Sequence, residues 1–359
     1  MGDVLPVVDT DIHSVTDGKH IQECLAEPYR SRWASGSRGP GHLGYWNPNG
    51  VMRSDTKLPD GSKIEQTAEN LSKHFMDTYQ LAYGILNPAG TLHVGLSPDP
   101  DYAAALCSAG NQVVAEDWLK ADSRYRASIV VSPQDPHLAA EEIHRCADNP
   151  GFVQVMMPSG QRMPYGQRVF YPIYEAAVAH GLPVAIHPGS EGVGVSGAPT
   201  ASGYPTTYFE WHTGLTGSYL AHLTSLVCEG VFVKYPTLKF VLVEGGVAWL
   251  PPAMWRFDKN WKALRQTTPW LEKPPSEYIA EHIRLTTQPI EEPENMKHLH
   301  AMLEMFPADK MLMFSTDFPH WDGDTPDYVA RSIPKSLQKR VMYDTAAELY
   351  KLPEVIHGE

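Results

Sequence analysis

Residues 7 to 13 read VVDTDIH, and this stretch carries the first indication of the fold. Its two valines and its isoleucine suit a buried β-strand, but Asp9, Asp11 and His13 stand two residues apart within it. Side chains of a strand alternate between its two faces. The three polar side chains therefore share one face, and that face must either contact water or bind a ligand.

Further hydrophobic stretches rich in Val and Ile follow along the chain, and segments with helical periodicity separate them. The eight predicted strands are residues 7–13, 83–88, 126–133, 152–160, 183–190, 239–246, 282–289 and 311–317. Continuous hydrophobic strands that alternate with helices are typical of a parallel sheet covered by helices. Eight such units predict the α/β class and a TIM-like (β/α)8 barrel.

Two polar segments, residues 14–64 and 189–217, interrupt this repeat and are rich in Gly, Pro and Ser. Each follows a predicted strand, so in a barrel both lie at the catalytic face. We interpret residues 14–64 as a long, lid-like insertion after the first strand. No linker or low-complexity segment marks a second domain, and we expect one barrel domain over residues 1–359.

The composition excludes several classes of partner. A formal net charge of -13 argues against nucleic acid and against an anionic membrane surface, because the long-range field repels polyanions. No stretch approaches 18 uninterrupted apolar residues, so no membrane span is expected. The 4 cysteines are scattered without a CxxC pair, which predicts reduced thiols in a cytoplasmic protein. A small-molecule substrate is the expected partner.

Ionisable residues recur at the predicted carboxyl ends of the strands. Asp11 and His13 end the first strand, His187 the fifth, Glu244 the sixth and Asp317 the eighth. In a barrel these ends converge on one mouth. Imidazole and carboxylate donors together suit one divalent cation, with Zn²⁺ the first prediction and Mn²⁺ the alternative because half of the donors are oxygen.

The same residues carry a resemblance. The DxH of residues 11–13, the HP of 187–188, the VEGG of 243–246 and the FSTDFPHWD of 314–322 resemble the amidohydrolase superfamily, in particular its branch around aminocarboxymuconate-semialdehyde decarboxylase. The resemblance extends over essentially the whole chain. It implies a distorted eight-stranded barrel that hydrolyses or decarboxylates small carboxylated or aromatic compounds, and it implies a homodimer.

The resemblance also implies roles for individual residues. Asp11, His13, His187 and Asp317 match the metal ligands, and the predicted fourth strand, FVQVMMPSG, has no Lys for a bridging carbamate, so one ion is expected. Many relatives carry a His on the sixth strand, where this chain has Glu244. That substitution leaves the proton carrier open among Asp317, Glu244 and His212. The predicted substrate-binding residues are Trp46, Trp211, Arg284 and His320.

Three functions remain open at this point. The first is a metal-dependent hydrolase in which Asp317 is the general base for a metal-activated water. The alternative is a non-oxidative decarboxylase of a small aromatic or unsaturated acid, and the second alternative is a noncatalytic small-molecule-binding barrel. The missing His on strand six favours hydrolysis. Several polar residues carry structural expectations instead: Asp9 as a hydrogen-bonding residue, His222 as a core histidine, and His93 as a surface residue.

Overall fold

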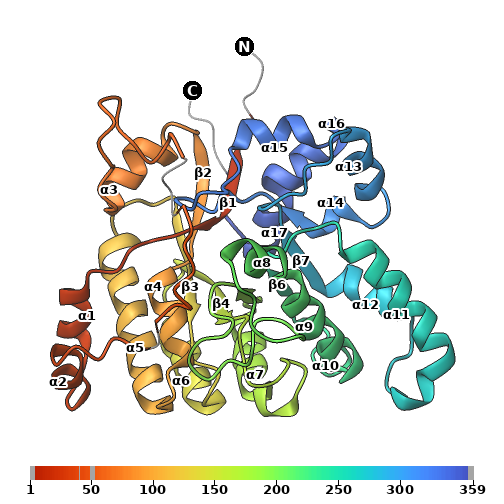
Figure 1. The fold of residues 1–359 in the computed structure, drawn as a ribbon, viewed down its shortest axis with the longest axis horizontal. Helices are drawn as coiled ribbons and strands as arrows, with labels where there is room; N and C mark the ends of the chain where they lie inside the picture. The colour runs from red at the N-terminus through yellow and green to blue at the C-terminus, as the bar shows by residue number, and fades with distance from the viewer. Residues whose placement is uncertain (1–4, 40, 49–52, 355–359) are drawn as a thin grey trace.

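The computed structural model describes residues 5–39, 41–48 and 53–354, and its eight strands form one sheet in the order β1 to β8. The strands are Val7–Ile12 (β1), Leu81–Leu86 (β2), Tyr125–Val130 (β3), Phe152–Pro158 (β4), Val184–His187 (β5), Phe240–Leu242 (β6), Ile283–Thr286 (β7) and Leu312–Met313 (β8). All neighbouring strands pair in parallel. The first and last strands also meet, because Thr10 N donates to Phe314 O at 3.0 Å. The predicted barrel is confirmed, and Figure 1 shows its strands surrounded by helices.

Most of the surrounding helices follow the strands one by one, as the sequence predicts. They are Gly18–Cys24 (α1), Tyr29–Ala34 (α2), Ala68–Leu71 (α3), Ala89–Leu92 (α4), Pro100–Val113 (α5), Pro136–Cys146 (α6), Tyr171–His180 (α7), Tyr208–Thr213 (α8), Thr216–Cys228 (α9), Val231–Lys234 (α10), Leu250–Leu264 (α11), Pro275–His282 (α12), Met296–Leu303 (α13), Ala308–Met311 (α14), Pro326–Ser332 (α15), Lys335–Lys339 (α16) and Thr345–Tyr350 (α17). Asp99 and Asp135 cap α5 and α6 by accepting hydrogen bonds from backbone N–H groups of the first turn. None of these helices, within the described ranges, has the length and apolar character needed to cross a bilayer.

Burial on both faces explains why the strands read as continuous hydrophobic stretches. Every residue of β1 and of β4 is buried, polar ones included. Parallel strands of a barrel have helices on one side and the packed interior on the other, so neither face meets water. The polar residues in these strands must therefore find partners inside the protein.

Asp9 and His222 find such partners, which confirms the structural role expected for each. The carboxylate of Asp9 accepts hydrogen bonds from the backbone N–H of Thr316, at 3.0 Å, and from its hydroxyl, at 2.6 Å. The imidazole of His222, on α9, donates from Nε2 to Ser159 O at 2.7 Å and accepts from Tyr165 N at 3.2 Å. Both residues hold neighbouring loops in place.

His222 predicts a pH dependence of stability. Burial lowers the pKa of His222 from 6.5 to about 4. Between these values the unfolded chain binds a proton that the folded chain does not, so the free energy of unfolding falls as the pH drops through this window. From pH 7 to pH 5 we expect this group to remove about 2 kcal/mol. Urea unfolding at both pH values should show a smaller difference for His222→Gln, and an equal difference would contradict the assignment.

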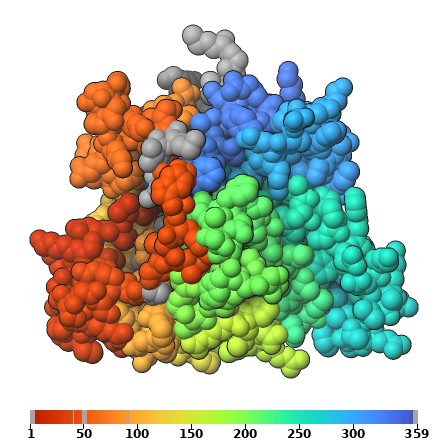
Figure 2. All heavy atoms as spheres, viewed as in Figure 1, coloured from red at the N-terminus to blue at the C-terminus, as the bar shows by residue number. Residues whose placement is uncertain are grey.

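The two long polar segments meet each other over the mouth of the barrel. Residues 41–48 of the first segment run in an irregular, extended path, and the hydroxyl of Tyr45 donates to the carbonyl of Pro205 in the second. Figure 2 shows the orange-red chain of the first segment lying against the green chain of the second. Residues 41–48 therefore lie beside the second segment, and the first segment also contributes α1, which packs on α5.

Candidate functional site

The carboxyl end of β1 brings Asp11 and His13 to the barrel mouth on one face, as their spacing predicts. The side-chain amide of Asn87 donates to Asp11 Oδ1 at 2.8 Å, while Asp11 Oδ2 is buried without a hydrogen-bond partner. Nδ1 of His13 donates to the carbonyl of Asn87 at 2.8 Å. This bond fixes the ring and directs Nε2 toward the centre of the mouth. Asn87, which directly follows β2, thus orients both residues.

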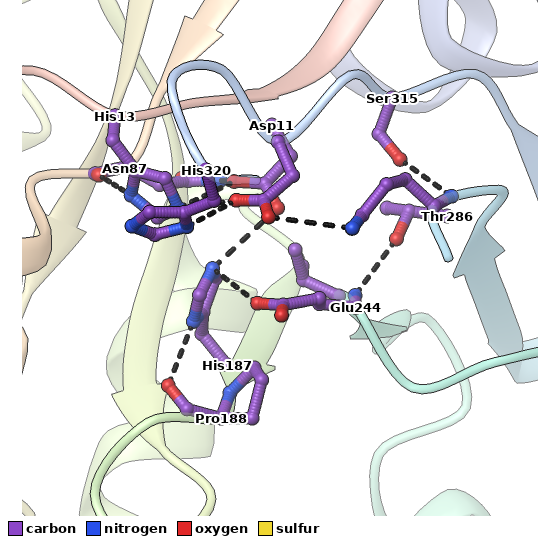
Figure 3. A network of polar contacts seen from close by, with 12 residues as sticks. Asp11, His13, Asn87, His187, Pro188, Glu244, Thr286, Ser315 and His320 are labelled. Atoms are coloured by element: carbon purple, nitrogen blue, oxygen red, sulfur yellow. Dashed lines mark hydrogen bonds and ion pairs between the residues drawn. The ribbon is translucent and has the colours of Figure 1, made fainter. Parts of the chain in front are cut away.

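His187 ends β5 and faces the same point. Its Nδ1 donates to the carbonyl of Pro188 at 2.9 Å, which leaves Nε2 with its lone pair. Nε2 is buried, has no hydrogen-bond partner, and lies 3.5 Å from Asp11 Oδ2. Figure 3 shows the two side chains pointing toward each other, with His13 and Glu244 beside them.

Asp317 follows β8 and completes the group. Its backbone is in the left-handed region, with φ of 53°, and its N–H donates to the carbonyl of Asp11 at 3.0 Å. Asp317 Oδ1 lies 2.8 Å from His13 Nε2 and accepts a hydrogen bond from His320 Nδ1 at 2.7 Å. Burial opposes ionisation, but His320 and His13 together hold the pKa of Asp317 well below its usual range. Its carboxylate is therefore charged.

Three of the four predicted ligands, Asp11, His13 and His187, form a group that could hold one divalent cation. Asp11 Oδ2 and His187 Nε2 are two buried polar atoms without hydrogen-bond partners, and such atoms are costly unless something binds them. Asp11, His13 and His187 offer donor atoms within 4.8 Å of one another, and so do Asp11, Glu244 and Asp317. A cation would also offset the charges of the carboxylates. Imidazole nitrogen with carboxylate oxygen is a donor set that both Zn²⁺ and Mn²⁺ accept.

Glu244 follows β6 and borders the ligand group on one side. Its Oε2 lies 3.5 Å from His187 Nε2, and its Oε1 lies 3.9 Å from His212 Nε2. Burial, and then the nearby carboxylates of Asp317 and Asp322, raise the pKa of Glu244 well above its usual range. His212, on α8, lies 3.0 Å from Asp322 Oδ2. The structure thus brings together all three residues that were left open as proton carriers.

A cavity of about 550 Å³ opens above these side chains. Its walls come from both long polar segments and from the loop after β8, and they include His13, His42, Tyr45, His93, His187, Glu191, Tyr208, Trp211, Glu244, His320, Trp321 and Asp322. Trp211 and His320 therefore lie where the sequence predicts substrate-binding residues. The walls are aromatic and rich in imidazoles, and none of the lining residues among those that the structure describes is a Lys or an Arg.

Two of the predicted substrate-binding residues lie elsewhere. Trp46 has an exposed fraction of 83%, and its neighbours Tyr45 and Asn47 line the cavity in its place. Arg284 is the second residue of β7 and lines a different cavity, at the amino ends of the strands. The sequence places Arg284 on the right strand but gives no measure of which end of that strand it occupies. The predicted contact between Arg284 and a substrate at the mouth is therefore wrong.

Several residues of the site were missed or misread. His93, expected at the surface, lines the cavity, and its Nδ1 is buried without a partner. Burial, followed by the charge of His42, lowers the pKa of His93 to about 3, so the ring is neutral. Gln288, whose amide donates to Asp317 Oδ2 at 3.3 Å, also went unnoticed. Asn87 and Gln288 do stand at the ends of predicted strands, and that position was the available signal.

A buried row of polar side chains runs from the mouth through the barrel. Asn87 holds Asp11, Ser128 donates to Asn87 Oδ1 at 2.5 Å, and Gln154 donates to Ser128 Oγ at 2.8 Å. The hydroxyl of Tyr350, on α17, donates to Gln154 Oε1 at 2.9 Å. Each amide in the row is thereby held in one orientation.

Tyr350→Phe removes the last bond of this row. Gln154 Oε1 then stays buried without a donor, and we expect a loss of about 1–3 kcal/mol in the free energy of unfolding. Urea unfolding measures this loss. Tyr83→Phe is a matched control, because the hydroxyl of Tyr83 bonds only to the carbonyl of Pro353 in the described part of the chain. Equal losses in the two variants would contradict the role of the buried row.

Comparison with known proteins identifies a family and several relatives. A family model described as Amidohydrolase matches residues 8–352. Gamma-resorcylate decarboxylase of Polaromonas sp. (strain JS666 / ATCC BAA-500) is 31% identical over 263 residues, which cover 67% of this chain and 75% of that protein. An amidohydrolase from Mycobacterium avium subsp. paratuberculosis K-10 has a TM-score of 0.74 at 19% identity, over 96% of this chain and 99% of that one.

A further solved structure carries a metal. It is a dihydroxybenzoic acid decarboxylase from Polaromonas sp. JS666 with bound manganese and the inhibitor 2-nitroresorcinol. Its TM-score to this chain is 0.67 at 22% identity, and the alignment covers 98% of each chain. At this identity the likeness establishes the shared barrel fold.

Proposed function

The chain belongs to the amidohydrolase family, and from this premise we propose that it is a metal-dependent, non-oxidative decarboxylase of a small hydroxylated aromatic acid. The observation that carries the choice of reaction is the 31% identity to a gamma-resorcylate decarboxylase over two thirds of the chain. The relatives thus favour the alternative named from the sequence over the hydrolase. The inference drawn from the missing strand-six histidine pointed the other way.

The metal site supports dependence on a divalent cation. Asp11, His13, His187 and Asp317 would hold the ion, and the two unpartnered atoms on Asp11 and His187 favour its presence. When bound, the ion supplies positive charge that orients the substrate carboxylate and an adjacent hydroxyl and stabilises negative charge on the ring. Manganese in a dihydroxybenzoic acid decarboxylase of the same fold favours Mn²⁺ over the Zn²⁺ first expected.

The proton for the reaction comes from the side chains around the ligands. Decarboxylation breaks the bond between the ring carbon and the carboxyl carbon, forms a carbon–hydrogen bond, and releases carbon dioxide. His320 lines the cavity, and its Nδ1 lies 2.7 Å from Oδ1 of the buried Asp317; this hydrogen-bonded pair can hold the proton and pass it to the ring through His320. Glu244 and His212 border the same space, and they keep the role of alternative proton carriers.

The walls of the cavity support an aromatic substrate with few charges. Tyr208, Trp211 and Trp321 offer flat faces against which a ring can stack. His93 offers a neutral ring nitrogen for a phenolic hydroxyl, and His42 lines the wall beside it. Because no Lys or Arg stands among the described lining residues, a single carboxylate that the metal would neutralise fits better than a substrate with two or three.

A panel assay tests the proposal. Protein loaded with Mn²⁺ is incubated with hydroxybenzoates that carry one carboxylate, and carbon dioxide release and the ring product are followed. We expect release from a hydroxybenzoate with a hydroxyl beside the carboxylate and none from the matched methyl ester. Turnover of lactones or amides without carbon dioxide release would favour the hydrolase. Tight binding of these acids without any turnover would favour the noncatalytic barrel.

The homodimer stays a prediction. On α11, Trp255 and Leu264 have exposed fractions of 57% and 56%, and exposed apolar side chains of this kind suit a subunit contact. Sedimentation analysis of the full chain would show twice the monomer mass if the prediction holds.

A further inference from the structure

A second cavity, of about 900 Å³, lies at the end of the barrel opposite to the mouth. Pro183, Lys239 and Arg284, which line it, stand at or just before the amino ends of β5, β6 and β7. Residues of α7, α12, α14 and α17, and of the loops beside them, contribute to the remaining walls. Within the described ranges the cavity shares no lining residue with the mouth, so it is separate from the site described above.

The second cavity is basic, although the chain as a whole carries a net charge of -13. Its basic lining residues are Lys239, Lys273, Arg284, Lys310, Arg340 and Lys351, and its acidic ones are Glu277, Glu281 and Glu348. A hollow with one excess sign of charge concentrates small ions of the opposite sign. On an acidic protein such a local excess of cations needs a reason.

Two of the three carboxylates are already bonded. Glu281 pairs with Lys273 at 2.5 Å, and Glu348 pairs with Arg340, with 2.9 Å between Oε2 and Nη2. The ammonium group of Lys239 donates to the main-chain carbonyl of Glu281 at 3.1 Å rather than to a carboxylate. Little negative charge therefore remains for the other cations.

Arg284 is the clearest unbalanced charge. Its Nη1 donates to the carbonyls of Glu281 and Ile283, at 3.3 and 2.8 Å, and it forms no ion pair with a carboxylate of the described residues. Burial lowers the pKa of Arg284, and burial followed by the charge of Arg284 lowers the pKa of Lys239. Two cations thus face each other in a partly buried place, which is unfavourable unless an anion joins them.

We propose that this cavity binds a small molecule that carries a phosphate or diphosphate group. Guanidinium groups match the oxygens of a phosphate with paired N–H donors, and lysines add charge from several directions. Arg284 and Lys239 lie at the strand ends, with Lys310 and Lys351 on other walls, so the cations surround the hollow instead of forming a flat patch. The volume exceeds that of one phosphate, which favours a phosphorylated compound over the free ion.

Titration calorimetry with pyrophosphate tests the proposal on the metal-loaded, full-length protein at constant ionic strength. We expect saturable binding, and at least a tenfold weaker affinity in Arg284→Met. Arg126→Met is a matched control: Arg126 is likewise the second residue of its strand and donates to main-chain carbonyls, but it does not line the cavity. It should bind as the unchanged protein does.

Lys310→Gln provides a second variant in case Arg284→Met is unstable, because Lys310 is exposed. It too should weaken binding, and citrate, which carries carboxylates only, should bind more weakly than pyrophosphate. Binding that persists undiminished in both Arg284→Met and Lys310→Gln would place pyrophosphate elsewhere, for example on the metal at the mouth, and would overturn the proposal. Equal losses in Arg126→Met, or no saturable binding, would overturn it as well.

Discussion

Asp317→Asn is expected to lower the turnover number for decarboxylation by about 10²–10⁴-fold. The substitution keeps the size of the side chain but removes the negative charge that lies 2.8 Å from His13 Nε2 and accepts a hydrogen bond from His320 Nδ1 at 2.7 Å. Both the proposed proton transfer and the proposed metal site use this carboxylate. Initial rates of carbon dioxide release, with Mn²⁺ in excess, measure the effect.

Asp324→Asn is the control for this variant. Asp324 is a buried carboxylate in the same loop after β8, accepts a hydrogen bond from Ile290 N at 3.3 Å, and does not line the mouth. Its substitution tests whether any loss of a buried carboxylate in this loop lowers turnover. A tenfold or smaller loss in Asp317→Asn, or equal losses in both variants, would show that Asp317 has no direct part in the reaction.

The second large effect concerns the affinity for the metal. His187→Ala removes the Nε2 atom that is buried without a hydrogen-bond partner 3.5 Å from Asp11 Oδ2. Loss of a residue that merely supports a ligand costs about 10–100-fold in metal affinity, so loss of a ligand should cost at least about 100-fold. Competition against a metallochromic chelator measures the dissociation constant directly.

His222→Gln serves as the matched control for His187→Ala. Both histidines are buried, but the two ring nitrogens of His222 already bond to Ser159 O and Tyr165 N. We expect His222→Gln to be less stable and yet to keep its metal affinity. An unchanged dissociation constant in His187→Ala would remove His187 from the ligand set, whereas a parallel loss in both variants would indicate a general disturbance of the barrel.

The barrel could be predicted from the sequence because its signal is repeated. Eight hydrophobic stretches that alternate with helical segments have few other solutions, and the observed strands fall within or close to the predicted ranges. Once the barrel was predicted, residues as distant in sequence as Asp11 and Asp317 could be placed at one mouth. In the structure Asp317 N–H donates to the carbonyl of Asp11, and Asp317 Oδ1 lies 2.8 Å from Nε2 of His13, which agrees with that placement.

Other parts of the site could not be predicted from the sequence. His93 lies in a short connection after β2, and nothing in its neighbourhood signals that the chain folds back over the mouth. Trp46 and Tyr45 are adjacent aromatic residues, and only the path of the loop determines that Tyr45 faces inward. Arg284 could be assigned to a strand but not to one of its ends. Even in a strand of 4 residues, one end lies at the mouth and the other at the opposite side of the barrel.

Glu244 shows how a single difference from a family pattern can mislead. The presence of Glu244 where many relatives carry a His suggested hydrolysis, because a carboxylate is a weaker proton carrier than imidazole near neutral pH. In the structure Glu244 lies between His187 and His212, and burial raises its pKa well above the usual range. A carboxyl group in such surroundings does not argue against decarboxylation.

The most direct test of the central claim is a titration of metal-depleted protein with Mn²⁺, in which bound metal and the rate of carbon dioxide release are measured on the same samples. We predict that the rate rises in proportion to bound metal and levels off at about one ion per chain, as expected for a single site built by β1, β5 and β8. Undiminished carbon dioxide release from the metal-depleted protein would contradict the account.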